Sequence, residues 1–379
     1  MRHSTAHRGE AGLHPRGQAT RHRRRRLHRG QAPQYRHGNR TGPAVARGRH
    51  RHPGAASGSG QGVRARRKRP AVVAFGGGHG LYAALSALRY LTTRLTAVVT
   101  VADDGGSSGR LREEFDILPP GDLRMALAAL CGDDEVGQTW AAVLQSRFGG
   151  TGPLAGHAIG NLLIAGLWQQ LPDPVAGLDM VGELLRTRGR VLPMAAVPLI
   201  IEADVFGADP AYPDELSVLR GQATVAKTEG EVRTVRLVPD RPAARPEVVA
   251  SVLAADHLVL GPGSWFTSVI PHLLVPELAE AILASKAQRI LTMNLVPADE
   301  THGFQASRHL EVLADHCPRL RLDVVLVDPS FAQDDPPLER YARSLGARLV
   351  VENVRMRDGS PRHDPHRLAA VYAELLNKS

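Results

Sequence analysis

The stretch AVVAFGGGHGLYAALSAL, residues 71–88, decides the fold. It opens with an apolar run of the kind that forms a buried strand, and after a turn it continues with leucines at helical spacing as far as Leu88. The turn, which we call the first loop (residues 76–80), contains Gly76, Gly77, Gly78, His79 and Gly80. A strand, a glycine turn and a helix in this order form a corner whose backbone N–H groups can point at a phosphate.

A second loop, residues 103–110, follows the next predicted strand, residues 97–101. It contains Asp103, Asp104, Gly105, Gly106, Ser107, Ser108 and Arg110. Hydroxyl and guanidinium groups suit phosphate oxygens. If the two strands are parallel neighbours, both loops face one crevice, and we expect a nucleotide-like ligand there.

The acidic pair Asp103-Asp104 has three interpretations. One carboxylate could hold a ribose or sugar hydroxyl. Alternatively the pair, and Asp104 in particular, could carry Mg²⁺ beside a diphosphate, because this ion prefers oxygen ligands. The third interpretation is a plain turn, since Asp-Gly is a common turn pair. We favour a functional role over the turn.

A third loop, residues 261–264, follows a predicted strand at residues 257–260. It consists of Gly261, Pro262, Gly263 and Ser264, and Ser268 and Asn294 are candidates to reach the same crevice. Four further candidates lie between the second and third loops: Asp122, Arg124, His157 and Asn161. Asp122 is equally well explained as the N-cap of a helix that runs to Leu130.

From Val72 onward the predicted strands and helices alternate, and this indicates an α/β fold. We expect a doubly wound, mostly parallel, Rossmann-like sheet in one domain over residues 70–379. A smaller β-rich insertion is predicted at about residues 206–245, and residues 191–205 are predicted as one strand.

The charge of the chain is unevenly distributed. Residues 1–70 hold 19 of the 47 Lys and Arg residues and one acidic residue, which leaves 28 basic against 37 acidic residues in the remainder. We expect residues 1–69 to be a disordered Arg/His/Gly-rich extension. Its composition favours an unselected extension, from a start codon assigned too far upstream, over a nucleic-acid-binding arm, and nucleic acid is not an expected partner.

The two cysteines, Cys131 and Cys317, form no disulfide framework, and this fits a reducing cytosol. No apolar run approaches the roughly 20 residues of a membrane-spanning helix. The expected location is therefore the cytoplasm, with no membrane partner, and a homo-oligomer is compatible with the sequence.

An oxidoreductase is a weaker alternative. The pattern Gly78-x-Gly80-x-x-Ala83, with Asp103 further on, matches the dinucleotide fingerprint of NAD-binding proteins. The sequence offers no recognisable proton donor for hydride transfer. It also contains no H-E-x-x-H zinc spacing and no G-x-S-x-G nucleophile elbow, so no catalytic residue is assigned.

Several segments resemble a known family. GGGHGL, VTVADDGGSSGRLREEFDILPPGDLR, GHAIGNLLIAGL and GPGSWFTSVIPHLLVPELAEAI resemble the YvcK-like gluconeogenesis factors, within the wider CofD-like (2-phospho-L-lactate transferase) superfamily. The resemblance covers about residues 70–376. It implies a Rossmann-like fold with a smaller subdomain.

The resemblance also implies a ligand. YvcK-like proteins bind UDP-sugars, notably UDP-N-acetylglucosamine, and support cell shape and envelope synthesis on gluconeogenic carbon sources. The contacts carried over to this chain are Gly77, Gly78, His79, Asp103, Asp104, Ser107, Ser108, Asn161 and residues 261–264. Two residues depart from the family pattern: His79 replaces a Thr or Ser, and Met125 replaces an Asn.

We therefore expect a UDP-sugar-binding regulatory protein of peptidoglycan precursor supply, without turnover of its own. The alternative implied by the resemblance is a CofD-type transferase, which moves a phospholactyl-type group to a deazaflavin. In that case Asp104, together with Asp122, would hold Mg²⁺.

Overall fold

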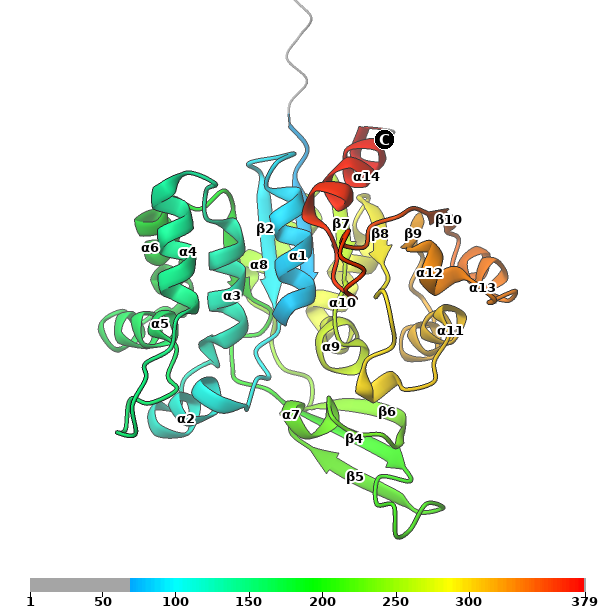
Figure 1. Cartoon of the computed structure of the whole chain (residues 1–379), viewed down its shortest axis with the longest axis horizontal. Coiled ribbons are helices and arrows are strands. Elements are labelled where there is room, and N and C mark those ends of the chain that lie inside the picture. Colours follow the sequence, from blue (N-terminus) through cyan, green and yellow to red (C-terminus); the bar gives the residue numbers. More distant parts are fainter. Residues whose placement is uncertain (1–68, 378–379) are drawn as a thin grey trace, which may run out of the picture. The chain divides into compact units, whose positions relative to one another are not determined.

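A parallel sheet of seven strands organises the computed structural model, which describes residues 69–377 (Figure 1). From one edge to the other, its strands are β10 (Arg348–Val351), β9 (Val324–Val327), β8 (Gln288–Thr292), β7 (His257–Leu260), β1 (Val72–Gly76), β2 (Leu95–Val99) and β3 (Arg190–Pro193). The extension predicted at residues 1–69 lies outside the described residues, apart from Arg69.

The chain order reverses in the middle of this sheet. β1 to β3 follow one another toward one edge, whereas β7 to β10 start again on the other side of β1 and proceed to the opposite edge. The residue Val72 of β1 is therefore paired with Leu95 of β2 and with His257 of β7. This arrangement confirms the predicted doubly wound fold, and it opens a crevice at the carboxyl ends of β1 and β7.

Helices cover both faces of the sheet. α1 (Gly78–Leu88) packs between α3 (Pro120–Leu130) and α14 (Pro365–Asn377) on one face, and α8 (Pro246–Leu253) packs against α10 (Pro276–Ala284) on the other (Figure 1). The remaining α-helices of this layered part are α2 (Gly106–Phe115), α4 (Glu135–Gln145), α5 (Ile159–Gln170), α6 (Pro174–Leu185), α9 (Pro271–Leu274), α11 (Ala306–His316), α12 (Pro329–Ala332) and α13 (Leu338–Ser344).

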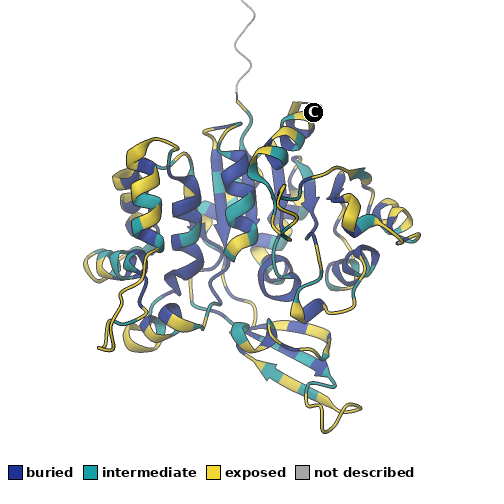
Figure 2. Cartoon of the chain, in the orientation of Figure 1, coloured by how far each residue is buried: buried dark blue, intermediate teal, exposed yellow. Residues whose placement is uncertain are grey.

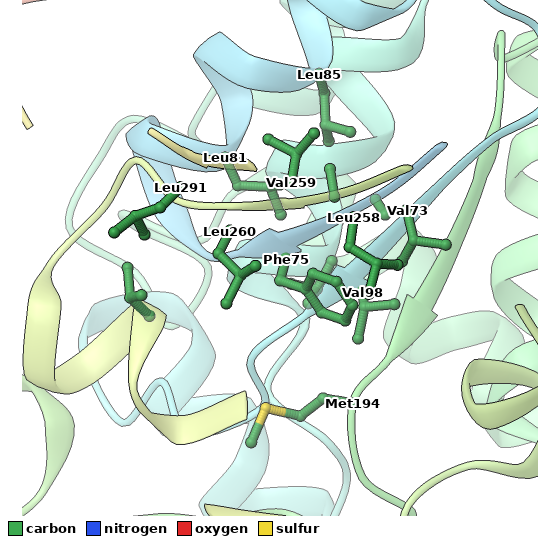
Figure 3. Close-up of a cluster of buried hydrophobic side chains, with 14 of the residues drawn as sticks. Val73, Phe75, Leu81, Leu85, Val98, Met194, Leu258, Val259, Leu260 and Leu291 are labelled. Carbon is green, nitrogen blue, oxygen red and sulfur yellow. The ribbon is translucent and has the colours of Figure 1, made fainter. Parts of the chain in front are cut away.

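The core lies between the sheet and these helices (Figure 2). All five residues of β1 are buried, as expected of a strand covered on both faces. Figure 3 shows side chains of the central strands packed together with Leu81 and Leu85 of α1. The leucines that predicted α1 from the sequence are therefore the residues that attach it to β1.

A second, antiparallel sheet has the strand order β5 (Leu216–Arg220), β4 (Ile200–Phe206), β6 (Glu231–Val238), and the short helix α7 (Gln222–Val225) follows β5. The prediction of one strand over residues 191–205 is wrong. β3 ends at Pro193 and β4 begins only after Pro198, because proline has no N–H group for the strand ladder. Within residues 69–377, no helix is long and apolar enough to cross a membrane.

Candidate functional site

The first and third loops are in direct backbone contact at the carboxyl edge of β1 and β7. A Cβ atom added to Gly80 would lie 2.2 Å from the carbonyl oxygen of Pro262. Gly78 has a φ of +56°, a conformation that other residues rarely adopt. Glycine is therefore required in the first loop for both the approach and the turn, which explains the glycine run in the sequence.

The second loop joins the first through Asp122. A Cβ atom on Gly77 would lie 2.4 Å from the Asp122 carboxylate, and one on Gly121 would lie 2.5 Å from Asp103 and 2.3 Å from the Ser108 hydroxyl. β2 ends at Val99, two residues earlier than predicted, so Asp103 lies in the connection to α2. All three loops thus meet at one edge of the sheet.

The buried Asp122 is not the N-cap of α3, which corrects that interpretation. α3 begins at Pro120 with Pro119 as its N-cap, so Asp122 lies inside the first turn. Its Oδ2 accepts a hydrogen bond from the Thr100 hydroxyl at 3.1 Å. Burial, together with the nearby Asp103 carboxylate, raises the pKa of Asp122 to about 6. Asp122 therefore changes charge slightly below neutral pH.

A chain of buried hydrogen bonds fixes the start of α2. Arg124 Nε donates to Asn161 Oδ1 at 2.9 Å, and Asn161 Nδ2 donates to Ser107 Oγ at 3.0 Å. Ser107 Oγ also accepts the Ala158 N–H, and it lies 3.0 Å from His157 Nδ1. Burial lowers the pKa of His157 and so favours the neutral ring, whose Nδ1 can accept the hydroxyl proton.

The members of this chain satisfy one another. Both acceptor positions of the Ser107 hydroxyl are occupied by N–H donors, and its proton points at His157. Ser108 is also buried, and its hydroxyl lies within 3.4 Å of the Asn161 amide nitrogen. These predicted site residues are therefore brought together, but they turn toward each other and hold α2 against α5.

Asp104 and Arg110 connect the second loop to other segments. Asp104 Oδ1 accepts the Ala223 N–H at 2.9 Å, at the start of α7. Arg110 Nη2 donates to the Ala155 carbonyl at 2.9 Å. Both residues also line a cavity of about 800 Å³, together with Arg112 and Arg220.

The fit to Mg²⁺ depends on the ligand. Among residues 69–377, no group of three or more His, Cys, Asp or Glu side chains is placed to hold a metal ion. One Asp104 oxygen is engaged by Ala223, and Asp103 Oδ1 accepts the Gly105 N–H at 3.0 Å. The remaining carboxylate oxygens of this pair fit Mg²⁺ only if the phosphates of a bound ligand supply further oxygen ligands to the ion.

The third loop is locked by Asn294, which follows β8. The Gly263 N–H donates to Asn294 Oδ1 at 2.9 Å, and Asn294 Nδ2 donates back to the Gly263 carbonyl at 2.9 Å. Ser268 is buried directly beneath Gly263. Asn294 and Ser268, both predicted as site residues, thus support the loop. Ser264 remains at the surface of the adjoining cavity.

That cavity, of about 470 Å³, lies where the first and third loops meet. His79, Gly80, Pro262, Gly263 and Asn294 form one wall. The other lining residues include Tyr82, residues 295–298 and, from the segment before α14, Met356, Arg362 and His363. Sequence reasoning missed these other residues. Only the helical spacing of α1, which places Tyr82 one turn from Gly78, could have indicated one of them.

The half-buried His363 keeps the C-terminal segment in place. Its Nε2 lies 3.2 Å from the Met293 carbonyl oxygen, and burial lowers the pKa of His363 to about 4. The ring is therefore neutral at physiological pH and donates a hydrogen bond to Met293, the residue that follows β8. Residues more than 280 positions apart in the sequence, His79 and His363, thus line the same cavity.

The fold, with three loops at its switch point, is that of a Rossmann-like α/β protein. The model of the 2-phospho-L-lactate transferase CofD family matches residues 72–360. The chain belongs to the YvcK-like gluconeogenesis factors of this CofD family.

Relatives and a solved structure each cover about four fifths of the chain. A relative from Mycobacterium tuberculosis is 56% identical over 305 residues, which are 79% of this chain and 88% of the relative. The gluconeogenesis factor of Listeria innocua is 35% identical over 82% of this chain and 97% of its own length. A crystal structure of a UPF0052 family member from Bacillus halodurans superposes with a TM-score of 0.70 at 33% identity, and covers 80% of this chain and 98% of that one.

Proposed function

We propose that this gluconeogenesis factor binds a nucleotide sugar of the UDP-N-acetylglucosamine kind, acts in the cytoplasm, and adjusts cell-wall precursor supply and cell shape on gluconeogenic carbon sources. The observation that carries the proposal is the cavity of about 470 Å³ where the first and third loops meet. Its size lies within the range of about 300–1,000 Å³ that is common for small-molecule sites.

The walls of this cavity suit the two ends of such a ligand. Tyr82 and Met356 offer apolar surface for a flat base, and His79 and Arg362 offer polar edges. α1 begins at the first loop with Gly77 as its N-cap and no side chain capping it. The Asp122 carboxylate already accepts the Gly78 N–H. The next N–H groups of the first turn, those of His79 and Gly80, are therefore the ones available to a diphosphate.

Calorimetry with UDP-N-acetylglucosamine on the full chain tests the proposal. We expect saturable binding, weaker binding of UDP, and no binding of free N-acetylglucosamine, because the loops recognise the diphosphate. Absence of binding by every member of a UDP-sugar panel would overturn the proposal.

A CofD-type transferase is the second candidate, and the match of residues 72–360 to that family favours it. Here the pair Asp103 and Asp104 would share Mg²⁺ with the phosphates of an activated donor. The cation would supply charge neutralisation at the transferred group. Formation of a phospholactyl-type deazaflavin product with Mg²⁺ present supports this function, and its absence removes it.

A further inference from the structure

Glu300 is a buried acid next to the third loop. It lies on the 3₁₀ turn η2 (Asp299–Thr301), and only 2% of its surface is exposed. Its Oε1 accepts the backbone N–H of Phe266 at 2.9 Å. Burying a carboxylate costs folding free energy, so we expect a carboxylate in this position to have a structural or functional role.

Phe266 belongs to η1 (Trp265–Val269), a π-helical turn that begins immediately after the third loop. The N–H groups of Ser268 and Val269 both donate to the Ser264 carbonyl, at 2.8 and 3.1 Å, so η1 and the loop are one hydrogen-bonded unit. Turns of this kind occur frequently at functional sites. Glu300 therefore anchors this unit through the Phe266 N–H, while Asn294 anchors it through the Gly263 N–H.

We propose that Glu300 is a positioning residue for ligand binding, whose carboxylate anchors η1 and thereby sets the third loop against the first. The inference rests on the proposed function, in which these two loops line the ligand cavity. Because the Pro262 carbonyl lies against Gly80, any shift of η1 changes the wall that Pro262 and Gly263 give to the cavity. Glu300 acts without contacting the ligand.

The charge of Glu300 is adjustable near neutral pH. Burial is the largest influence and raises the pKa of Glu300 to about 7, although the Phe266 N–H and the Thr267 hydroxyl favour the charged form. The charged carboxylate accepts hydrogen bonds more strongly than the neutral acid. The anchor is therefore strongest above pH 7 and weakens as the pH falls through that value.

The charged residues of the neighbouring strand β6 are engaged in ion pairs. On β6, which packs against η2, Glu231 is paired with Arg233 at 2.8 Å, and Arg236 is paired with Glu202 on β4. α7 carries no charged residue.

Three histidines also lie around η1. His272 follows η1 on α9, the ring of His309 is 5.0 Å from that of Trp265, and the ring of His316 is 6.1 Å from that of Phe266. Burial lowers the pKa of His272 and of His309 to about 4, so these two are neutral between pH 6 and pH 8. Glu300→Gln leaves all three histidines in place, so a pH effect that this substitution removes belongs to Glu300.

Calorimetry with UDP-N-acetylglucosamine at pH 6 and pH 8 tests the proposal. Glu300→Gln keeps the side-chain volume and an acceptor for Phe266 but removes the charge. We expect it to bind about tenfold more weakly than the wild type at pH 8 and equally at pH 6, because the wild type is then protonated. The diphosphate of the probe has the same charge at both values. Asp299→Asn, on the same turn but exposed, is the matched control and should change neither affinity.

A second measurement needs no ligand. Trp265 is fully buried in η1, and its fluorescence can be isolated by Trp140→Phe and Trp168→Phe. We expect its emission to titrate with a midpoint near pH 7, and this titration to disappear with Glu300→Gln and to persist with the shorter acid of Glu300→Asp. A titration unchanged by Glu300→Gln, or equal affinities at pH 8, would overturn the inference. If the wild type binds no UDP-sugar, the proposed function fails, while the fluorescence titration still decides whether Glu300 controls η1.

Discussion

The two sides of the crevice use the same kinds of residue in different ways. Where the first and third loops meet, the absence of side chains matters: Gly80 lets the Pro262 carbonyl approach, and the surrounding walls stay open to a cavity. At the start of α2, by contrast, the polar side chains are sealed, because Ser107, Asn161 and Arg124 bond to each other. Elsewhere in the second loop, Asp104 and Arg110 line a separate cavity. Glycine, serine and asparagine in a loop therefore indicate a corner near a ligand, but not which side chains touch it.

The largest expected effect is on the open side. Gly80→Ala places a methyl group 2.2 Å from the Pro262 carbonyl oxygen, and neither loop can move away without breaking its contact with the other loop. We expect UDP-N-acetylglucosamine affinity to fall at least a thousandfold, about 4 kcal/mol, when measured by calorimetry. Gly149→Ala is the matched control, because a Cβ there meets nothing within 4 Å. Unchanged affinity in Gly80→Ala would show that the two loops do not form the binding site.

Asp122 lies between the two sides, and its effect depends on pH. Its pKa is raised in the folded state to about 6 from an ordinary 3.8, so it contributes stability that is fully present below pH 4 and is lost as the pH rises through 6. Asp122→Asn removes this loss. Urea unfolding should therefore show the variant gaining about 3 kcal/mol on the wild type between pH 3 and pH 7. A difference that does not change with pH would mean that Asp122 is not desolvated.

On the sealed side, stability should change more than binding. Asn161→Ala leaves Arg124 and Ser107 without their shared partner, and unsatisfied buried groups of this kind cost about 2 kcal/mol of unfolding free energy. The affinity of the folded protein for the ligand should change less than about threefold. Gln169→Ala, exposed on the same helix, is the control for both measurements. A large loss of affinity with unchanged stability would return Asn161 to the set of direct ligand contacts.

The smallest effect is expected at the cavity wall. Tyr82→Ala removes an aromatic surface that half-faces the cavity, and we expect about tenfold weaker binding, or about 1.4 kcal/mol. Tyr212→Ala provides the comparison, because Tyr212 is exposed in the connection between β4 and β5. Equal affinities of the two variants would mean that the base of the ligand does not pack on Tyr82.

The local parts of this site were predictable from the sequence. β1 and α1 follow from one apolar run, a glycine turn and leucines at helical spacing, all within residues 71–88. Such signals are short-range, and parallel strands buried on both faces give uninterrupted apolar runs. The same short-range signals predicted the doubly wound fold, and the structure confirmed it.

The remaining parts depend on long-range packing. Asp122 has the sequence context of a helix cap, but α3 starts earlier because Pro120 suits the first helical position. Met356 and His363 carry no motif, and they line the cavity only because α14 returns to pack on α1. Which polar residue faces a cavity and which faces another side chain is decided in three dimensions, so the sequence pattern could not separate Ser264 from Ser107.

The meeting of Gly80 with Pro262 also has a consequence for synthesis. The ribosome releases the first loop early, yet its partner lies 182 residues later, and the segment around His363 follows later still. Contacts between such distant residues form late in folding. The nascent chain therefore has no finished site to offer a metabolite, and only the completed polypeptide can respond to one.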